Sequence, residues 1–124
     1  MFTVNFSGIK DEPSYLADSL QRGIDEDKVV KISTNLTVAL CDEEDNFRGV
    51  VVTIDHGNEV CAVKERGYVT LPYTGSAPSV GEAVELVANG DGGVKTPASP
   101  DTGKRYPVVD VDTEANTVTF KLLG

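Results

Sequence analysis

The central stretch of the chain, Phe47–Pro72, alternates short apolar runs with turn signals. Val50–Ile54 is a β-branched run, and the Asp55–Asn58 segment that follows it is a polar cluster typical of a turn. Alternating apolar positions come next, at Val60, Ala62, Val69 and Leu71. Alternation with a period of two is typical of half-buried strands, so this stretch predicts three short strands.

The same pattern continues on both sides of the central stretch. Further strands are predicted over Val29–Ile32, Leu36–Leu40, Ala83–Ala88, Tyr106–Val111 and Thr117–Leu122. The last two would form a closing hairpin over Asp112–Asn116. Asn89–Gly93 is rich in glycine and predicts a tight turn. From residue 23 onwards the chain therefore reads as an all-β domain.

The first 22 residues have a different pattern. Phe2, Val4 and Phe6 alternate with polar residues, which indicates a short strand or an extended arm. Leu16 and Leu20 are four residues apart, which is compatible with one or two helical turns or with an irregular arm. We therefore expect an N-terminal arm over residues 1–22 and a β-barrel domain over residues 23–124.

A faint echo links the two halves of the chain. The similar pairs are Lys28–Ile32 with Glu82–Leu86, Val50–Val51 with Val108–Val109, and Asn58–Val60 with Asn116–Val118. Two similar β units packed as one small barrel or sandwich would produce this echo. Chance similarity between valine-rich strands is the alternative.

Composition narrows the picture. A chain of 124 residues is long enough for one domain with its own core. Valine dominates the apolar residues and tryptophan is absent, which favours strands because β-branched side chains suit a pleated surface. We expect Cys41 and Cys61 to be two buried thiols, with a disulfide as the alternative that a chain of this size does not need. Neither cysteine has a CxxC partner or a nearby histidine for metal or redox work.

The net charge of −9 argues against a nucleic-acid groove, which needs a basic face to neutralise phosphate. No apolar run is long enough to span a membrane, and the N-terminus lacks the pattern of a signal peptide. We therefore expect no nucleic-acid and no membrane partner. The charge suits a protein packed at high local concentration or a partner with a positive surface.

Candidate chemistry is sparse. His56, the only histidine, lies in a turn with no serine, cysteine or second histidine spaced to work with it. Asp110, Asp112 and Glu114 lack the pattern of a calcium loop and are expected to line a solvated strand edge. Asp42–Asp45 is an acidic turn, either solvated or a docking site for a basic partner. Asn89–Gly93 joins two strands, so it lacks the strand–helix context of a phosphate cradle. We expect no enzymatic activity, no metal and no cofactor.

The N-terminal arm is the most suggestive binding feature. Its apolar residues are Phe2, Val4, Phe6, Tyr15 and Leu16. A terminal segment this apolar is expected to dock, either on its own barrel as an edge strand or on a partner chain by strand addition. We expect these five residues to carry the contact with a partner or a neighbouring copy.

From Gly23 onwards, the order of motifs resembles the capsid decoration proteins of tailed double-stranded-DNA phages, also called cement or head-stabilising proteins. The segments that carry the resemblance are Gly23–Asp27, Phe47–Val51, Gly67–Pro72, Val80–Leu86, Tyr106–Val109 and Val118–Leu122. They include the sequences GYVTLP and VGEAVEL, which match the patterns G-x-V-x-L-P and V-G-x-x-V-x-L of that family. The resemblance covers about four fifths of the chain.

The resemblance implies a β-barrel or β-tulip-like fold, no catalysis, and homotrimers or other oligomers on the outer surface of the virion head. The expected partners are the major capsid protein and further copies of this chain. The implied function is to stabilise the expanded head against the pressure of the packaged DNA. Alternatives are a tail or baseplate β-module, a small-ligand-binding β-barrel with an apolar internal cavity, and an enzyme, for which no polar triad is visible.

Overall fold

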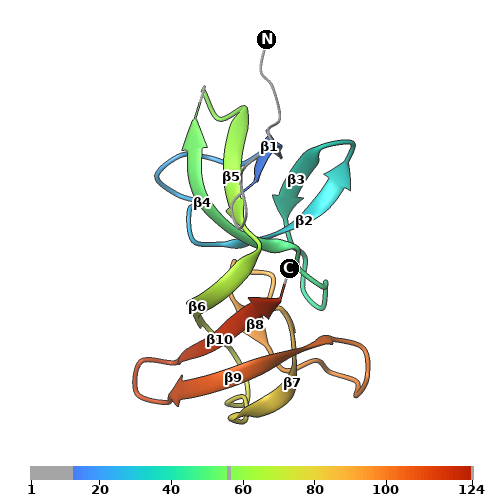
Figure 1. The fold of residues 1–124 in the computed structure, drawn as a ribbon, viewed down its shortest axis with the longest axis vertical. Helices are drawn as coiled ribbons and strands as arrows, with labels where there is room; N and C mark the ends of the chain where they lie inside the picture. Colours follow the sequence, from blue (N-terminus) through green and yellow to red (C-terminus); the bar gives the residue numbers. More distant parts are fainter. Residues whose placement is uncertain (1–12, 56, 124) are drawn as a thin grey trace.

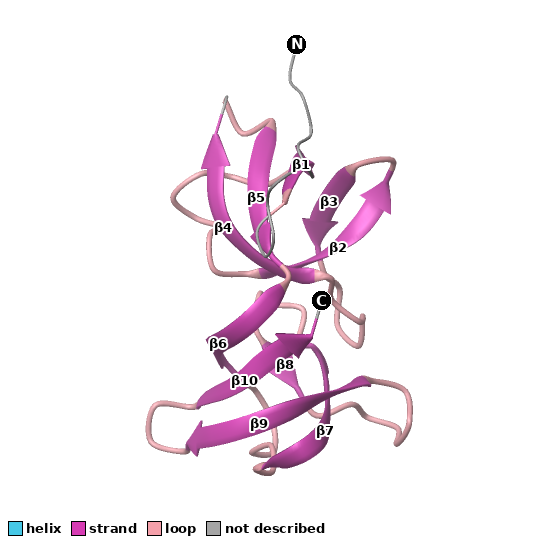
Figure 2. Cartoon of the chain, in the orientation of Figure 1, coloured by secondary structure: helices cyan, strands magenta, loops and turns pink. Residues whose placement is uncertain are grey.

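The computed structural model describes residues 13–55 and 57–123, and all regular structure in this part is β-strand (Figures 1 and 2). The strands are β1 (Ser14–Asp18), β2 (Val29–Thr34), β3 (Thr37–Leu40), β4 (Gly49–Asp55), β5 (Val60–Lys64), β6 (Arg66–Pro72), β7 (Gly81–Ala88), β8 (Val94–Lys95), β9 (Lys104–Asp112) and β10 (Thr117–Leu123). The predicted all-β, small-barrel fold is confirmed, and the predicted closing hairpin is β9–β10.

The first five strands form a closed barrel, here called the first barrel, in the order β1-β3-β2-β4-β5. Strand β1 closes it by pairing in parallel with β3 and antiparallel with β5. Its core is built from inward-facing side chains of every strand. These are Tyr15, Val30, Val38, Val51, Ile54, Cys61 and Val63, and Leu20 from the loop after β1 joins them. Burying β-branched side chains on one face of each strand is the main source of stability for such a small barrel.

The last five strands form a second, curled sheet in the order β6-β10-β9-β7-β8. Figure 1 shows it in the lower half of the view, below the first barrel. Its open ends approach each other after β6, where Tyr73 forms a parallel bridge with Val94. Thr74 N–H donates to the Val94 carbonyl at 3.2 Å. The second sheet is therefore a near-closed barrel.

The two units repeat one topology. If β1 is matched with β6, and β2–β5 with β7–β10, the strand order around both units is the same. The bond from Leu16 N–H to the Leu36 carbonyl has a counterpart in the bond from Thr74 to Val94. Asn58 and Asn116, which the sequence echo aligns, both adopt positive φ in the turns before β5 and β10. The sequence echo therefore reflects two units with the same strand order. These units are joined to each other and do not form one common barrel.

A shared core joins the units. Phe47, from the loop between β3 and β4, stacks on Tyr106 with ring centroids 5.3 Å apart, and its ring meets Phe120 edge-on at 6.0 Å. Val29 and Val50 of the first barrel belong to this same cluster. Because one apolar core crosses the junction, the units are expected to unfold together.

The structure corrects two expectations. Residues 14–18 are neither helical nor an irregular arm but strand β1, because pairing with β3 and β5 satisfies their backbone groups. The expected arm of residues 1–22 therefore does not end at a structural boundary. In β5 the side chains of Cys61 and Val63 are buried, while those of Val60 and Ala62 are only half-buried. The strand therefore alternates as predicted, but Cys61 and Val63 face the core in place of Val60 and Ala62.

Candidate functional site

The five residues expected to contact a partner fall into two groups. Phe2, Val4 and Phe6 lie outside the described residues, so their role stays a prediction. Tyr15 is only 4% exposed and belongs to the core of the first barrel, while Leu16 is half-buried on the same strand. This corrects the expectation for Tyr15, whose ring is already covered by its own chain.

The Tyr15 hydroxyl reaches a charged cluster at the edge of the first barrel. It donates a hydrogen bond to Glu65 Oε2, and Arg48 Nε donates to the same oxygen at 2.8 Å. Burial, followed by the bond to Glu65, raises the pKa of Tyr15 above its usual value. The side chain of Glu65 is only 13% exposed, so its carboxylate is largely shielded from water. Hydrogen bonds from Tyr15 and Arg48 stabilise its negative charge there.

Replacing Tyr15 with phenylalanine is expected to lower the free energy of unfolding by about 1–2 kcal/mol, because a hydrogen bond to a partly buried carboxylate is lost while Arg48 still pairs with Glu65. Urea unfolding at pH 7 measures this. Tyr68→Phe is the matched control, since Tyr68 is 55% exposed and its loss of a hydroxyl should leave the midpoint unchanged. Equal midpoints for both variants and the parent would contradict the expectation.

The acidic turn, Asp42–Asp45, is a strap between the two units. Glu44 N–H donates to the Ala88 carbonyl at 2.9 Å, and Ala88 N–H donates to the Asp45 carbonyl at 2.8 Å.

The carboxylates of this turn form ion pairs with lysines on both sides. Lys31 lies 2.6 Å from Asp45 and 3.2 Å from Asp42. On the other side, Lys95 lies 2.9 Å from Glu43 and 2.5 Å from Glu44. The four carboxylates thus already pair with two lysines of this chain, which favours a structural role over docking of a basic partner.

The strap is expected to respond to acid. The bond from Lys31, followed by the one from Asp42 N–H, lowers the pKa of Asp45, and Lys95, followed by Ala98 N–H, lowers that of Glu44. A lowered pKa in the folded state means that stabilisation is present above the unfolded pKa of about 4 and is lost as pH falls through the folded value. Acidification from pH 7 to pH 3 should therefore loosen the strap.

The measurement compares urea midpoints at pH 7 and pH 3. The parent protein is expected to lose more stability over this range than the double variant Glu44→Gln/Asp45→Asn, which has no carboxylates left to protonate at these positions. Asp110→Asn is the control, because Asp110 is exposed and forms no ion pair within residues 13–55 and 57–123. If the urea midpoint of the double variant fell as much between pH 7 and pH 3 as that of the parent, Glu44 and Asp45 would not be the source of the acid sensitivity.

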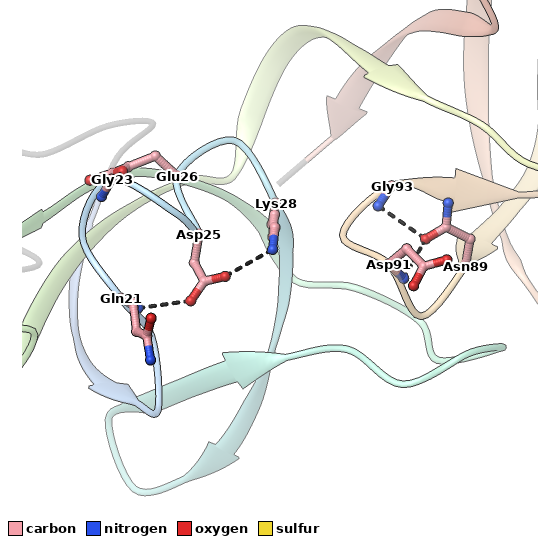
Figure 3. Close-up of polar contacts among 8 residues, drawn as sticks. All are labelled: Gln21, Gly23, Asp25, Glu26, Lys28, Asn89, Asp91 and Gly93. Atoms are coloured by element: carbon pink, nitrogen blue, oxygen red, sulfur yellow. Dashed lines mark hydrogen bonds and ion pairs between the residues drawn. The ribbon is translucent and has the colours of Figure 1, made fainter.

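Two buried polar side chains shape loops at the junction, as Figure 3 shows. Asp25 accepts hydrogen bonds from Gln21 N–H at 2.8 Å and from Lys28 Nζ at 3.0 Å. Asn89 Oδ1 accepts from Asp91 N–H at 2.7 Å and from Gly93 N–H at 3.1 Å. The predicted tight turn at Asn89–Gly93 is confirmed. Two of its amides already donate to its own asparagine, which further weakens the phosphate-cradle interpretation.

The remaining candidate residues form no catalytic or metal-binding cluster in the described part of the chain. His56 lies outside it. Asp112 Oδ1 accepts from Glu114 N–H and Ala115 N–H, each at 3.0 Å, so this carboxylate caps a turn. Within the described ranges no three side chains among histidine, cysteine, aspartate and glutamate converge as metal ligands would.

Both cysteines are buried and free, as expected. Burial raises the pKa of Cys41 to about 12 and that of Cys61 to about 11. Since the thiolate is the reactive form, both thiols are held in an unreactive state at neutral pH.

A groove that sequence reasoning missed runs along the junction. It has a volume of about 420 Å³ and is lined by Val50–Val52 of β4 and Tyr68–Pro72 of β6, with Asp27 and Lys64 beside them. Most of these side chains are apolar. The groove lies between two strands that are separated in the chain only by β5 and are not paired with each other, so no local sequence pattern marks it.

Among the described residues, no helix is long and apolar enough to cross a membrane. No protein-family model matches this chain, and no curated protein matches it.

Proposed function

We propose that this chain is a capsid decoration protein of a tailed phage, which binds the outer surface of the expanded head and stabilises it against internal DNA pressure. The observation that carries the proposal is the order of strand and turn motifs from Gly23 to the C-terminus. Several of these motifs form the framework of the second sheet. Gly67–Pro72 lies in β6, all but the first residue of Val80–Leu86 lies in β7, and Tyr106–Val109 lies in β9.

The architecture is suited to this role. The two units are joined by one apolar core and an ion-paired strap, which makes them a single body. Repeating a modest interface many times around a shell adds stability by multivalency, with no need for a single large contact. The proposed partners are the major capsid protein and further copies of this chain, with a homotrimer as the expected oligomer.

The test is co-sedimentation of the full-length protein with heads that lack it. Expanded empty heads are expected to bind the protein to saturation, in a fixed ratio to the major capsid protein, and to resist heating better once decorated. Tail or baseplate assemblies, purified in parallel, should not bind it. Saturable binding to tails and not to heads would favour the rival assignment as a tail or baseplate module, and binding to neither would defeat both.

The arm prediction can be tested in the same assay. Deleting Met1–Ser7 removes Phe2, Val4 and Phe6 and is expected to weaken head binding at least about tenfold, because loss of even one aromatic anchor, buried against the capsid or against a neighbouring copy on it, typically costs more than about 1.4 kcal/mol. The free energy of unfolding should change little. Unchanged affinity in a folded variant would show that the arm does not carry the contact.

A further inference from the structure

The groove between β4 and β6 borders a stretch of the β6 edge with which none of the described strands pairs. On its other side β6 pairs with β10 from Arg66 to Pro72. Lys64 Nζ donates to the Tyr68 carbonyl at 2.8 Å, so this carbonyl points away from β10. Backbone groups alternate along a strand, so the N–H and C=O of Thr70 point the same way. At the end of β6 the edge is covered, since Tyr73 bridges to Val94 of β8.

This edge fits an extended apolar peptide. A strand laid along it would bond to the main chain of Thr70 and place alternate side chains against Val50, Val52 and Leu71. The sequence contains one segment of that kind outside the described residues. Phe2, Val4 and Phe6 alternate with polar residues within the 12 residues that precede Pro13.

We propose that the groove binds the Phe2–Phe6 segment of a second copy of this chain, which adds as a strand to the open edge of β6. Twelve residues span at most about 40 Å when extended, enough to reach a neighbouring molecule. Exchange of terminal segments between identical chains is a low-cost route to oligomers. The proposal identifies the self-contact of the proposed oligomer, but it does not require that the oligomer bind a head.

The position of β1 favours a second copy over the chain's own segment. Strand β5 has β1 along one edge and β4 along the other. The Pro13 carbonyl accepts from Val63 N–H at 3.0 Å, so the chain enters the first barrel on the β1 edge. The groove lies on the β4 edge. A segment preceding Pro13 therefore starts on the side of the β5–β6 ribbon opposite its own groove.

Disulfide trapping between two full-length single variants tests the exchange. Val4→Cys and Thr70→Cys are mixed under mild oxidation, and the covalent heterodimer is expected to form about tenfold faster than with the control partner Thr113→Cys, because a docked segment has a high effective concentration. Thr113 lies exposed in the β9–β10 turn, outside the groove. The native cysteines are buried and should not interfere.

A double variant Val4→Cys/Thr70→Cys distinguishes the two sources of the segment. Covalent oligomers are expected. A fast-migrating monomer with an internal disulfide, formed at a rate independent of dilution, would overturn the proposal in favour of docking within one chain. Trapping no faster than in the control would overturn it outright.

Hydrogen exchange gives a second readout without engineered cysteines. The Thr70 amide is expected to become more protected as the concentration of the parent protein rises. Phe2→Ser/Phe6→Ser should abolish this dependence, while the matched variant Thr3→Ser/Asn5→Ser should keep it. A Thr70 amide that exchanges equally in all three proteins at all concentrations contradicts the proposal, whatever the result of head binding.

Discussion

Replacing Phe120 with alanine is expected to lower the free energy of unfolding by about 3–5 kcal/mol. The side chain of Phe120 is fully buried, and its ring meets those of Tyr106 at 5.2 Å and Phe47 at 6.0 Å, both edge-on. The substitution removes the ring and leaves a cavity in the core that both units share. Domains of this size are typically stable by only about 5–15 kcal/mol, so the loss would be a large fraction of the total.

Guanidinium unfolding followed by circular dichroism measures this effect. Val109→Ala is the control, because Val109 lies on β9, close to Phe120 in the pairing of the sheet, yet is 49% exposed. It is expected to change stability by about 0.5 kcal/mol or less. If Phe120→Ala cost no more than this control, the shared aromatic core would not be what holds the units together.

Replacing Gly49 with alanine is expected to destabilise the fold by about 3 kcal/mol, at the upper end of the effects of overpacking. A Cβ on Gly49 would lie 2.3 Å from the Lys64 carbonyl oxygen and 2.8 Å from Val63 Cγ1. The nearer atom is backbone, so β4 or β5 must shift where Val50 pairs with Lys64. Gly49 also pairs with Val30 of β2, so the strain falls on two ladders of the first barrel.

Gly81→Ala is the matched control for this variant. Gly81 likewise begins a strand, but a Cβ there would make only an ordinary contact of 3.5 Å with Val84. Differential scanning calorimetry should show a drop of several degrees in Tm for Gly49→Ala and a much smaller change for Gly81→Ala. Similar shifts in both variants would mean that the close approach at Gly49 is relieved by other means.

The sequence was sufficient to predict the strands that are long and valine-rich, because alternation of apolar and polar residues is a local signal. It failed at β1, where Leu16 and Leu20 have helical spacing. In the fold, Tyr15 points inward from a strand, and Leu20 is buried only after Ser19 adopts a positive φ of 61°. The residues that decide this strand, in β3 and β5, lie more than twenty positions away along the chain.

Which face of β5 points into the core, and the existence of the groove, could not be predicted from the sequence, for related reasons. Val60, Cys61, Ala62 and Val63 are all apolar, so composition cannot choose the inward face, and a register shift in β4 between Val51 and Thr53 sets the pairing. The groove depends on how β6 leaves the first barrel, which is a property of the packed units. The acidic turn was visible in the sequence, but its lysine partners, Lys31 and Lys95, are identified only by the fold.

The sharpest test of the proposed role is electron cryomicroscopy of the particles produced by a phage whose genome encodes this chain. Density for two joined β units is expected on the outer surface of the expanded head, repeated at symmetry-related positions around the shell. Density for the protein in the tail or baseplate only, or its absence from the particle, would contradict the account.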